Sequence, residues 1–184
     1  MRLSELRGQF LLAMPSLMDP NFHHGVVLIC HHDDEGCMGF LVNRTHNISV
    51  GSVLGDMKLR GDHLLDMPTY EGGPVEPFRG FVIHDGELHY ESTLSITSEI
   101  QLTTSRDVLE DVANGNGPDS FILALGYAGW SEGQLEQEIN RNDWLIVPAS
   151  NEILFHAPVE HRWLLGTKKL GIEPDQLSLH AGHA

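Results

Sequence analysis

Apolar side chains gather in short runs along the chain, and four of these runs are typical of β-strands. Each run is short, contains β-branched or aromatic residues, and is bounded by residues that favour turns. Because the runs are not interrupted by polar residues, we expect the strands to be buried. The four predicted strands are Phe10–Met14, Val26–Cys30, Gly39–Val42 and Phe121–Leu125.

The segment Phe81–Tyr90 has the pattern of a β-hairpin. Asp85-Gly86 lies between FVIH and ELHY, and this dipeptide is favoured in a type I′ turn, where both central residues have positive φ. Pairing across a two-residue turn puts the apolar side chains of the segment on one face. We therefore expect His84 and His89 on the polar face of the hairpin, outside the core.

Three further segments have apolar residues at helical spacing together with helix start or stop signals. Ser131 with Gln134 is a capping box, and Gly171 is a stop signal. The first predicted helix runs from Thr104 or Ser105 to Asn114-Gly115. The second begins at Ser131 and carries Leu135 and Ile139 on one side, and the third covers about Val159–Leu170. Because strands and helices do not alternate regularly, the pattern favours an α+β fold over a doubly wound sheet.

The composition is that of one globular domain. The 184 residues are 41% hydrophobic and 20% charged, and no linker or internal repeat divides them, so we expect a single domain over residues 1–184. Asp and Glu number 26 against 11 Lys and Arg, which gives a formal net charge of −15. Because no basic stretch interrupts the acidic residues, direct binding to nucleic acid and docking on anionic lipid are not expected.

Neither a leader peptide nor a membrane-spanning segment is recognisable in the sequence. The apolar stretch Phe10–Met14 is too short for a signal peptide, and no run approaches the roughly 18 residues that a spanning helix needs. We therefore expect a soluble, cytoplasmic protein. In that compartment Cys30 and Cys37 are expected to be reduced thiols.

Twelve histidines are many beside 11 Lys and Arg, and they raise the question of a metal site. His24 and His32 flank a predicted strand and share its face with Cys30, and imidazole with thiolate is a common zinc set. However, an extended strand separates the two histidines by roughly 26 Å, which is too far for one ion. We predict no metal and no cofactor.

Signatures of the common enzyme mechanisms are absent from the sequence. It contains no G-x-S-x-G elbow, no G-x-x-x-x-G-K-[ST] loop and no G-x-G-x-x-G turn. A dyad of Cys37 with a histidine stays open, but the sequence does not identify the partner. His84 is a second option, as a general base, because an imidazole pKa of about 6.5 suits proton transfer near neutral pH.

One arginine and two glycine-containing segments allow either a binding role or a structural one. Arg44 follows Asn43 at a strand end, where its guanidinium could hold a carboxylate or phosphate, or tie down a loop carbonyl. The Gly72-Gly73 turn could form a nest of amides for an anion, or only a tight turn. Residues 126–130 join a strand to a helix, where backbone N–H groups could face a ligand or simply pack.

Several motifs, in order along almost the whole chain, resemble those of the YqgE/AlgH family of bacterial proteins. They are RGQFLLAMPSLMDPNF (7–22), the strand VVLICHH (26–32), EGCMGFLVNR (35–44), YEGGPV (70–75), RGFVIH (79–84), LTTSRDVLE (102–110), LALGYAGWSEGQLEQEI (123–139) and the terminal GHA (182–184). The sequence departs from the family pattern at Thr45, where Pro is usual.

The resemblance implies an α+β fold with a mixed, mainly antiparallel sheet that partly closes into a small barrel and is flanked by helices. It brings no established biochemical activity with it, although one branch of the family was named as a transcriptional regulator of alginate production. Twelve residues match the family pattern, and nine of them are the predicted binding surface: Asn43, Arg44, Gly72, Gly73, His84, Tyr127, Trp130, Gln134 and Glu138, with Pro74, Ser105 and Asp107 as the other matches.

Three hypotheses for function follow. The leading one is a binding or regulatory module whose polar, glycine-rich surface site takes a small molecule or a protein. The second is a small-molecule enzyme that uses His84 as general base. The third, and least favoured, is a regulator that contacts DNA, which rests on the family name alone and is opposed by the net charge of −15.

Overall fold

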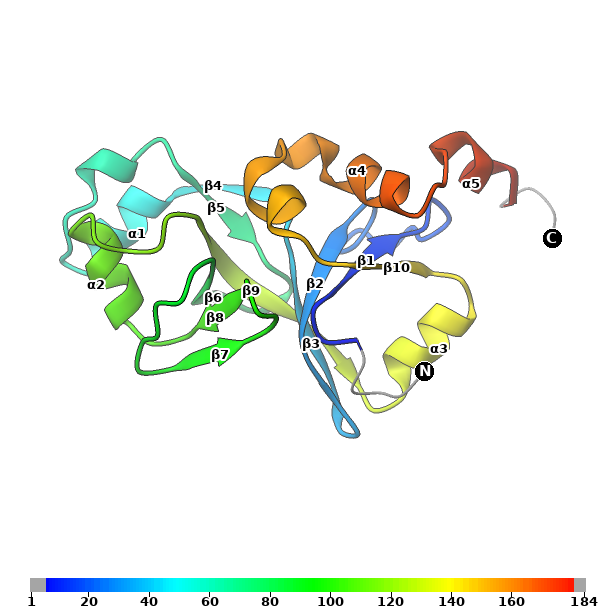
Figure 1. Cartoon of the computed structure of the whole chain (residues 1–184), viewed down its shortest axis with the longest axis horizontal. Helices are drawn as coiled ribbons and strands as arrows, with labels where there is room; N and C mark the ends of the chain where they lie inside the picture. The colour runs from blue at the N-terminus through cyan, green and yellow to red at the C-terminus, as the bar shows by residue number, and fades with distance from the viewer. Residues whose placement is uncertain (1–5, 181–184) are drawn as a thin grey trace.

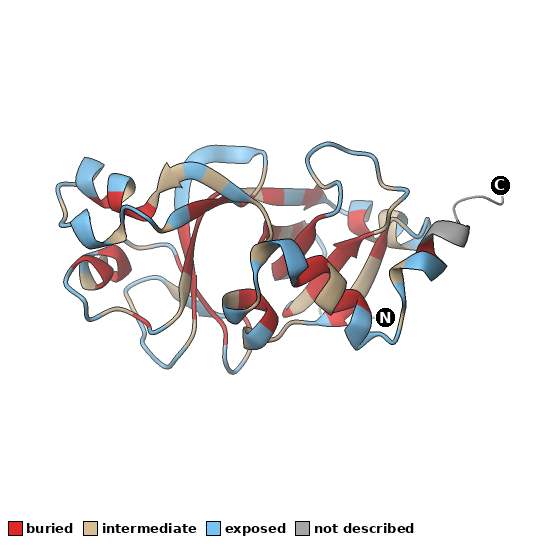
Figure 2. Ribbon diagram, turned by 90° about the horizontal axis from the view of Figure 1, so that it is seen from above, coloured by how far each residue is buried: buried red, intermediate tan, exposed pale blue. Residues whose placement is uncertain are grey.

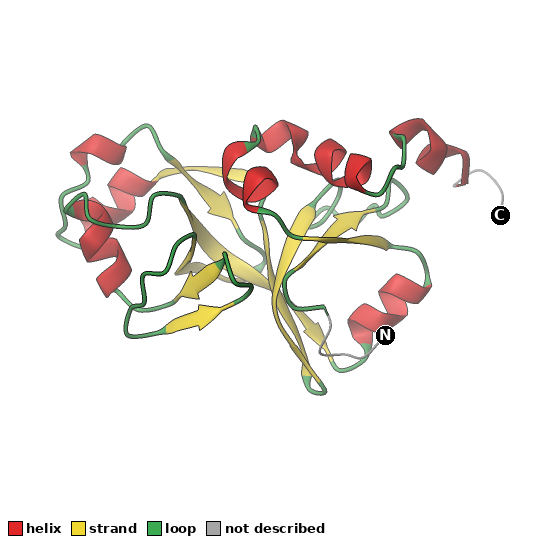
Figure 3. Ribbon diagram, in the orientation of Figure 1, coloured by secondary structure: helices red, strands yellow, loops and turns green. Residues whose placement is uncertain are grey.

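A computed structural model describes residues 6–180 of the chain. Its strands are β1 Gln9–Ala13, β2 Val26–Asp33, β3 Gly36–Leu41, β4 Thr45–Ser49, β5 Pro68–Glu71, β6 Val75–His84, β7 Thr93–Ser95, β8 Gln101–Thr103, β9 Phe121–Ser131 and β10 Trp144–Pro148. Its α-helices are α1 Val50–Asp56, α2 Asp107–Ala113, α3 Gln134–Asn140, α4 Arg162–Lys169 and α5 Pro174–His180. The helices lie around the sheet, α1 and α2 at one end and α3 to α5 at the other (Figure 3).

The strands form one curled sheet in which neighbours are mainly antiparallel (Figure 1). The order along the sheet is β10-β1-β2-β3-β9-β6-β8-β7, and β5 joins it by pairing with β4 and, in parallel, with β9. This arrangement confirms the predicted α+β class with a mixed, mainly antiparallel and partly closed sheet.

Strand β9 connects the two ends of the sheet because its two halves have different neighbours. Residues up to Leu125 pair with β5 and β6, and Tyr127 pairs with Val75 at the start of β6, whereas residues from Ala128 pair with β3. Gly126 separates the halves with a φ of 76°, a left-handed conformation that glycine adopts without a steric penalty. The strand therefore changes direction at this residue, and the sheet curls around it.

Strands β1 and β2 and the first half of β9 are buried on both faces, and Figure 2 shows buried strands in red under the outer helices, whereas β4, β7 and the first six residues of β6 have no buried residue. Strand β1 illustrates this, since Phe10 and Leu12 enter one apolar cluster while Leu11 and Ala13 enter another. A strand that is covered on both faces needs apolar residues without alternation. This is why the sequence shows unbroken apolar runs rather than a period of two.

The four predicted strands and the three predicted helices are all present, with shifted ends. The strand predicted over Phe121–Leu125 is longer, because β9 continues to Ser131. The prediction that residues 126–130 form a connection between a strand and a helix was therefore wrong. Their backbone groups take part in the sheet, where Cys37 pairs with Trp130 and Gly39 with Ala128.

The hairpin predicted over Phe81–Tyr90 was also wrong. Strand β6 ends at His84 and pairs with β8 and β9, while no strand is assigned to residues 85–90. The face that carries Val82 and His84 is buried, and Val82 packs with the core of α2. His84 is therefore fully buried rather than on a polar face.

None of the helices within residues 6–180 has the length and apolar character needed to cross a membrane.

Candidate functional site

A recess of about 450 Å³ opens where α1, β6, β8, β9 and the start of α2 meet, and we call it the Thr103 pocket. Its floor is apolar and comes from Val82, Leu109, Leu123 and Leu125, which are all buried side chains. Ligand pockets of proteins are commonly of this size and combine apolar walls with a few polar groups. The pocket therefore has the general character of a small-molecule site.

The polar edge of the Thr103 pocket comes from Asp56 and from the segment Thr104–Arg106. The Arg106 guanidinium donates to the carbonyl of Met57 at 2.7 Å and to Glu110 at 3.1 Å. These two contacts hold the side chain against α1 and α2. The guanidinium of Arg106 and the hydroxyl groups of Thr104 and Ser105 thus lie beside the apolar floor.

Ser105 links this edge to the loop before β7. Its hydroxyl donates to Asp107 at 2.5 Å and accepts from the backbone N–H of Ser92 at 3.0 Å. Burial opposes ionisation of Asp107, but the hydrogen bonds from Ser105 and from the backbone of Glu91 and Val108 outweigh it and lower the pKa of this carboxyl group. The ionised Asp107 therefore anchors the loop that stands behind the pocket.

His84 lies behind the pocket and contacts one of its lining residues. Its Nδ1–H donates to the carbonyl of Asp85 at 3.0 Å, so Nε2 is the acceptor for the Thr103 hydroxyl at 2.7 Å. Thr103 in turn lies 2.8 Å from the Thr93 hydroxyl. Burial lowers the pKa of His84. A neutral imidazole whose two nitrogens are both engaged positions Thr103 and has no free basic nitrogen for a ligand.

Phe78 stands at the mouth of the pocket with 92% of its surface exposed. It belongs to a bulge of β6 between Val75, which pairs with Tyr127, and Gly80, which pairs with Leu125. The bulge contains Glu76 with a φ of 46°, which is an uncommon conformation for a residue with a side chain. The fold thus holds a large apolar ring in solvent beside an apolar recess.

Asn43 and Arg44 hold the loop between β1 and β2. The Asn43 amide accepts from the backbone N–H of Val26 at 2.8 Å and donates to the carbonyl of His24 at 2.9 Å. The Arg44 guanidinium donates to three loop carbonyls, those of Pro20, Asn21 and His23. Of the two roles open from the sequence, these contacts correspond to the tying of loop carbonyls.

The Gly72-Gly73 segment crosses β9 in close contact. A Cβ on Gly72 would overlap the carbonyl oxygen of Gly126, and one on Gly73 would overlap the carbonyl group of Tyr127. The N–H of Gly72 donates to the carbonyl of Leu125 at 2.8 Å, so it is not free for an anion. Gly73 and Arg44 together line a smaller recess of about 250 Å³.

Trp130 of β9 and Gln134 and Glu138 of α3 form a separate cluster between the helix and the sheet. One carboxylate oxygen of Glu138 accepts from the indole N–H groups of Trp130 at 2.9 Å and Trp144 at 2.8 Å, and the other accepts from the Gln134 amide at 3.1 Å. Gln134 also accepts from the N–H of Ser131, which is half of the predicted capping box. These contacts attach α3 to the sheet.

The nine predicted residues therefore do not converge on one pocket. Gly73 and Arg44 line the small recess, His84 stands behind the Thr103 pocket, and the α3 cluster lies at the other end of the sheet. The ring of Tyr127 packs edge-on against Phe81. Prediction from the sequence missed Thr103, Arg106 and Phe78 as pocket residues, although the motifs RGFVIH and LTTSRDVLE carry or flank all three.

No group of three or more His, Cys, Asp or Glu side chains within the described part of the chain is placed to hold a metal ion. Cys30 and Cys37 are both buried and free. Burial, followed by the charge of Glu136, raises the pKa of the Cys37 thiol to about 12. The thiol is therefore protonated at neutral pH, which does not favour a nucleophilic role.

The chain is similar in sequence to one protein family and to several known bacterial proteins. Residues 10–175 match a family model described as AlgH-like. A UPF0301 protein of Ralstonia nicotianae is 49% identical over 181 residues, which cover 97% of this chain and 95% of the relative. A UPF0301 protein of Vibrio parahaemolyticus is 42% identical over 97% of this chain and 99% of its own length.

Solved structures give the same result. The solution structure of the AlgH protein from Pseudomonas aeruginosa superimposes with a TM-score of 0.81 and 40% sequence identity, covering 100% of both chains. A crystal structure of a protein from Corynebacterium diphtheriae, at 19% identity and a TM-score of 0.77, shares the fold over 97% of this chain and 94% of that one. These matches confirm the resemblance noted in the motifs, and this chain belongs to the AlgH-like family.

Proposed function

We propose that this protein is a binding module that takes a small amphipathic molecule in the Thr103 pocket. The observation that carries the proposal is the apolar floor of Val82, Leu123 and Leu125 beside the polar edge at Arg106. An apolar body on the floor would be stabilised by about 0.8 kcal/mol for each buried methylene. A carboxylate or similar head group on the ligand would accept hydrogen bonds from the segment Thr104–Arg106.

The chemistry of the pocket supports binding rather than catalysis. Asp56 and Arg106 are the lining residues with charged side chains, and Arg106 is already held by Met57 and Glu110. The hypothesis of an enzyme with His84 as general base has less support, because both ring nitrogens of that buried residue are engaged. Of the other predicted residues, Arg44 and Gly73 line the smaller recess, and the cluster of Trp130, Gln134 and Glu138 lies at the other end of the sheet, so these residues take no part in the proposed site.

Calorimetric titration with octanoate, hexanoate and butyrate tests the proposal. We expect octanoate to bind most tightly and each methylene removed to weaken binding by about fourfold. Arg106→Gln should weaken binding of all three, since it removes the cation at the head-group end. Arg79→Gln is the matched control, because Arg79 is a similarly exposed, ion-paired arginine outside the pocket.

A second variant tests the floor without removing a core side chain. A Cβ on Gly80 would lie 3.4 Å from a methyl group of Leu123, so Gly80→Val narrows the pocket at ordinary contact distance. It should abolish octanoate binding while the thermal unfolding curve keeps its shape. Octanoate binding that is unchanged in both Gly80→Val and Arg106→Gln would assign the ligand to another place and refute the proposal.

A further inference from the structure

Phe78 is the most exposed of the large apolar side chains within residues 6–180, with 92% of its surface in solvent against 72% for Met18. A single exposed apolar side chain is ordinary on a protein surface. Phe78 differs from Met18 because it also lines the Thr103 pocket, whereas Met18 does not. The ring therefore offers an apolar surface that a molecule in the pocket can cover.

The bulge of β6 fixes the backbone at Phe78 and leaves its side chain free to turn. Residues 76–79 have no pairing partner in β9, and Pro77, which has no N–H to donate, suits this gap in the ladder. Arg79 pairs with Glu76 across the bulge at 3.1 Å. The ring of Phe78 can therefore change its position by rotation about two side-chain bonds, without a change of the backbone.

Phe78, Gly80 and Val82 line the pocket, whereas the two residues between them do not. This alternation is typical of one face of a strand, so the three residues follow one another along the pocket wall. A Cβ built on Gly80 would lie 3.4 Å from a methyl group of Leu123 and would meet no other atom of the described chain within 4 Å beyond its sequence neighbours. Glycine at this position leaves an open slot between the Phe78 ring and the apolar floor.

The part of the lining that comes from α1 and the end of β4 is also apolar. Ile48, Val53 and Met57 line the recess, and each is half-buried. The charged and hydroxyl groups of the lining belong instead to Asp56 and to the segment Thr103–Arg106. A ligand that matches this lining has an apolar body and one polar end.

We propose that Phe78 selects ligands with a flat aromatic body, so that the Thr103 pocket takes an aromatic carboxylate in preference to a linear one. This inference rests on the function proposed for that pocket and specifies its ligand class. The aromatic body would lie over Gly80 with one face against the Phe78 ring, and the carboxylate would lie at Thr104–Arg106. Aromatic pairs are stabilised beyond the effect of buried area, which an alkyl chain does not gain.

Calorimetric titration of Phe78→Leu and Phe78→Tyr with 2-naphthoate and octanoate tests the proposal. Leucine keeps an apolar side chain without a ring, whereas tyrosine keeps the ring. We expect 2-naphthoate to bind about fivefold more weakly to Phe78→Leu, which is the effect of losing one aromatic pair, and to bind Phe78→Tyr like the unmodified protein. The affinity for octanoate should change less than about twofold in either variant, because both still offer it an apolar surface.

Met18→Leu is the matched control, because Met18 is an exposed apolar side chain outside the pocket. It should bind both acids like the unmodified protein, and thermal melts establish that all three variants are folded. If octanoate binds but 2-naphthoate binds Phe78→Leu as tightly as the unmodified protein, Phe78 does not select the ligand, and this inference fails while the proposed function stands. If neither acid binds the unmodified protein, both fail.

Discussion

Single polar groups decide how several parts of this protein are held, and Glu138 is the clearest example. One of its carboxylate oxygens accepts from two indole N–H groups, those of Trp130 and Trp144, and both tryptophans are about 95% buried. Neither indole has another acceptor among the contacts described. Glu138→Ala would therefore leave two buried donors without partners.

We expect Glu138→Ala to lower the free energy of unfolding by about 2–4 kcal/mol, since each unsatisfied buried donor costs about 1–3 kcal/mol. Glu138→Gln keeps an acceptor oxygen and should cost less. Urea unfolding followed by tryptophan fluorescence measures both variants. Equal stability of the alanine and glutamine variants would show that the carboxylate does not hold the indoles.

Burial of His84 predicts a dependence of stability on pH. Its pKa is lowered from 6.5, mainly by burial, so the unfolded chain takes up a proton at a higher pH than the folded protein does. The contribution of His84 to stability is therefore complete above pH 6.5 and is lost as the pH falls below that value. The pKa of His24 is also lowered, by burial and by the charge of His23, so His24 contributes to the same dependence on pH.

The melting temperature should accordingly fall between pH 7.5 and pH 5.5, about one unit on either side of the ordinary imidazole pKa of 6.5. His84→Gln, although less stable at every pH, should show a shallower fall over this range. Calorimetry at several pH values gives the slope of melting temperature against pH for each protein, and this slope is the quantity to compare. A slope that is the same in the variant would mean that another group titrates.

Individual residues also show which positions in the fold a local sequence pattern can predict and which it cannot. Burial of Phe10, Leu28 and Leu123 follows from unbroken apolar runs. The position of His84 could not be predicted, because Asp85-Gly86 is a strong local signal that tertiary pairing of β6 with β8 overrides. The role of Glu138 depends on Trp144, and no spacing rule connects these two residues.

At the scale of elements, the crossing of the segment before β6 with β9 determines the shape of the sheet. Gly72 and Gly73 lie against Gly126 and Tyr127 so closely that a side chain on either glycine would meet backbone atoms. Backbone is less able to move than a flexible side chain. The sequence motif YEGGPV predicted a special backbone position, but the partner strand became visible only in the fold.

Gly72→Ala should therefore destabilise the protein severely, by about 3 kcal/mol or more, as steric overpacking of a rigid site does. Gly55→Ala is the control, because a Cβ at this position in α1 meets no atom within 4 Å. It should be neutral or stabilise the protein by about 0.5–1 kcal/mol, the helix preference of Ala over Gly. Chemical denaturation compares the two variants, and similar values for both would contradict the tight crossing.

At the scale of the whole molecule, charge is the property that follows most directly from composition. With a formal net charge of −15, the protein repels other polyanions, and its own acidic side chains repel one another within the folded state. The described salt bridges of Arg79, Arg106 and Arg141 each join an arginine to a nearby acid in the chain, which offsets part of the positive charge. Direct binding of DNA is therefore not expected.

A gel shift with duplex DNA at low salt checks this expectation and should show no retardation, because binding of this kind depends on neutralising phosphates. Raising the salt concentration should increase the melting temperature, since counterions screen the repulsion between carboxylates. Retardation of DNA at low salt that disappears at high salt would contradict the expectation.

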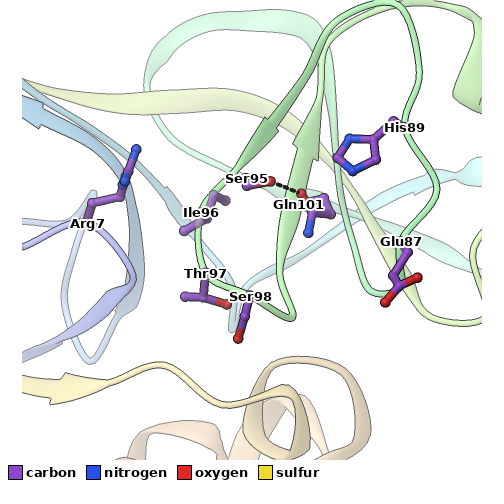
Figure 4. A pocket seen from close by; sticks show the side chains of 8 residues that line it. All are labelled: Arg7, Glu87, His89, Ser95, Ile96, Thr97, Ser98 and Gln101. Atoms are coloured by element: carbon purple, nitrogen blue, oxygen red, sulfur yellow. Dashed lines mark hydrogen bonds between the residues drawn. The ribbon is translucent and has the colours of Figure 1, made fainter.

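The sequence could not predict which segments of the chain come together to form the two recesses. A recess of about 670 Å³ lies between Arg7 and the β7–β8 hairpin (Figure 4), and the Thr103 pocket joins Asp56 to β9. These pairs are far apart in the chain and carry no shared motif. They become neighbours only because the sheet curls and brings its ends and loops together.

The two-sided pairing of β9 has a consequence for synthesis of the protein. The chain leaves the ribosome from its N-terminus, so β3 and β6 are made before Phe121–Ser131, the strand that lies between them. Until then both have an open edge, and open edges invite pairing with other chains. The nascent protein is thus most prone to aggregation before β9 emerges, and fragments that end before residue 121 are poor targets for expression.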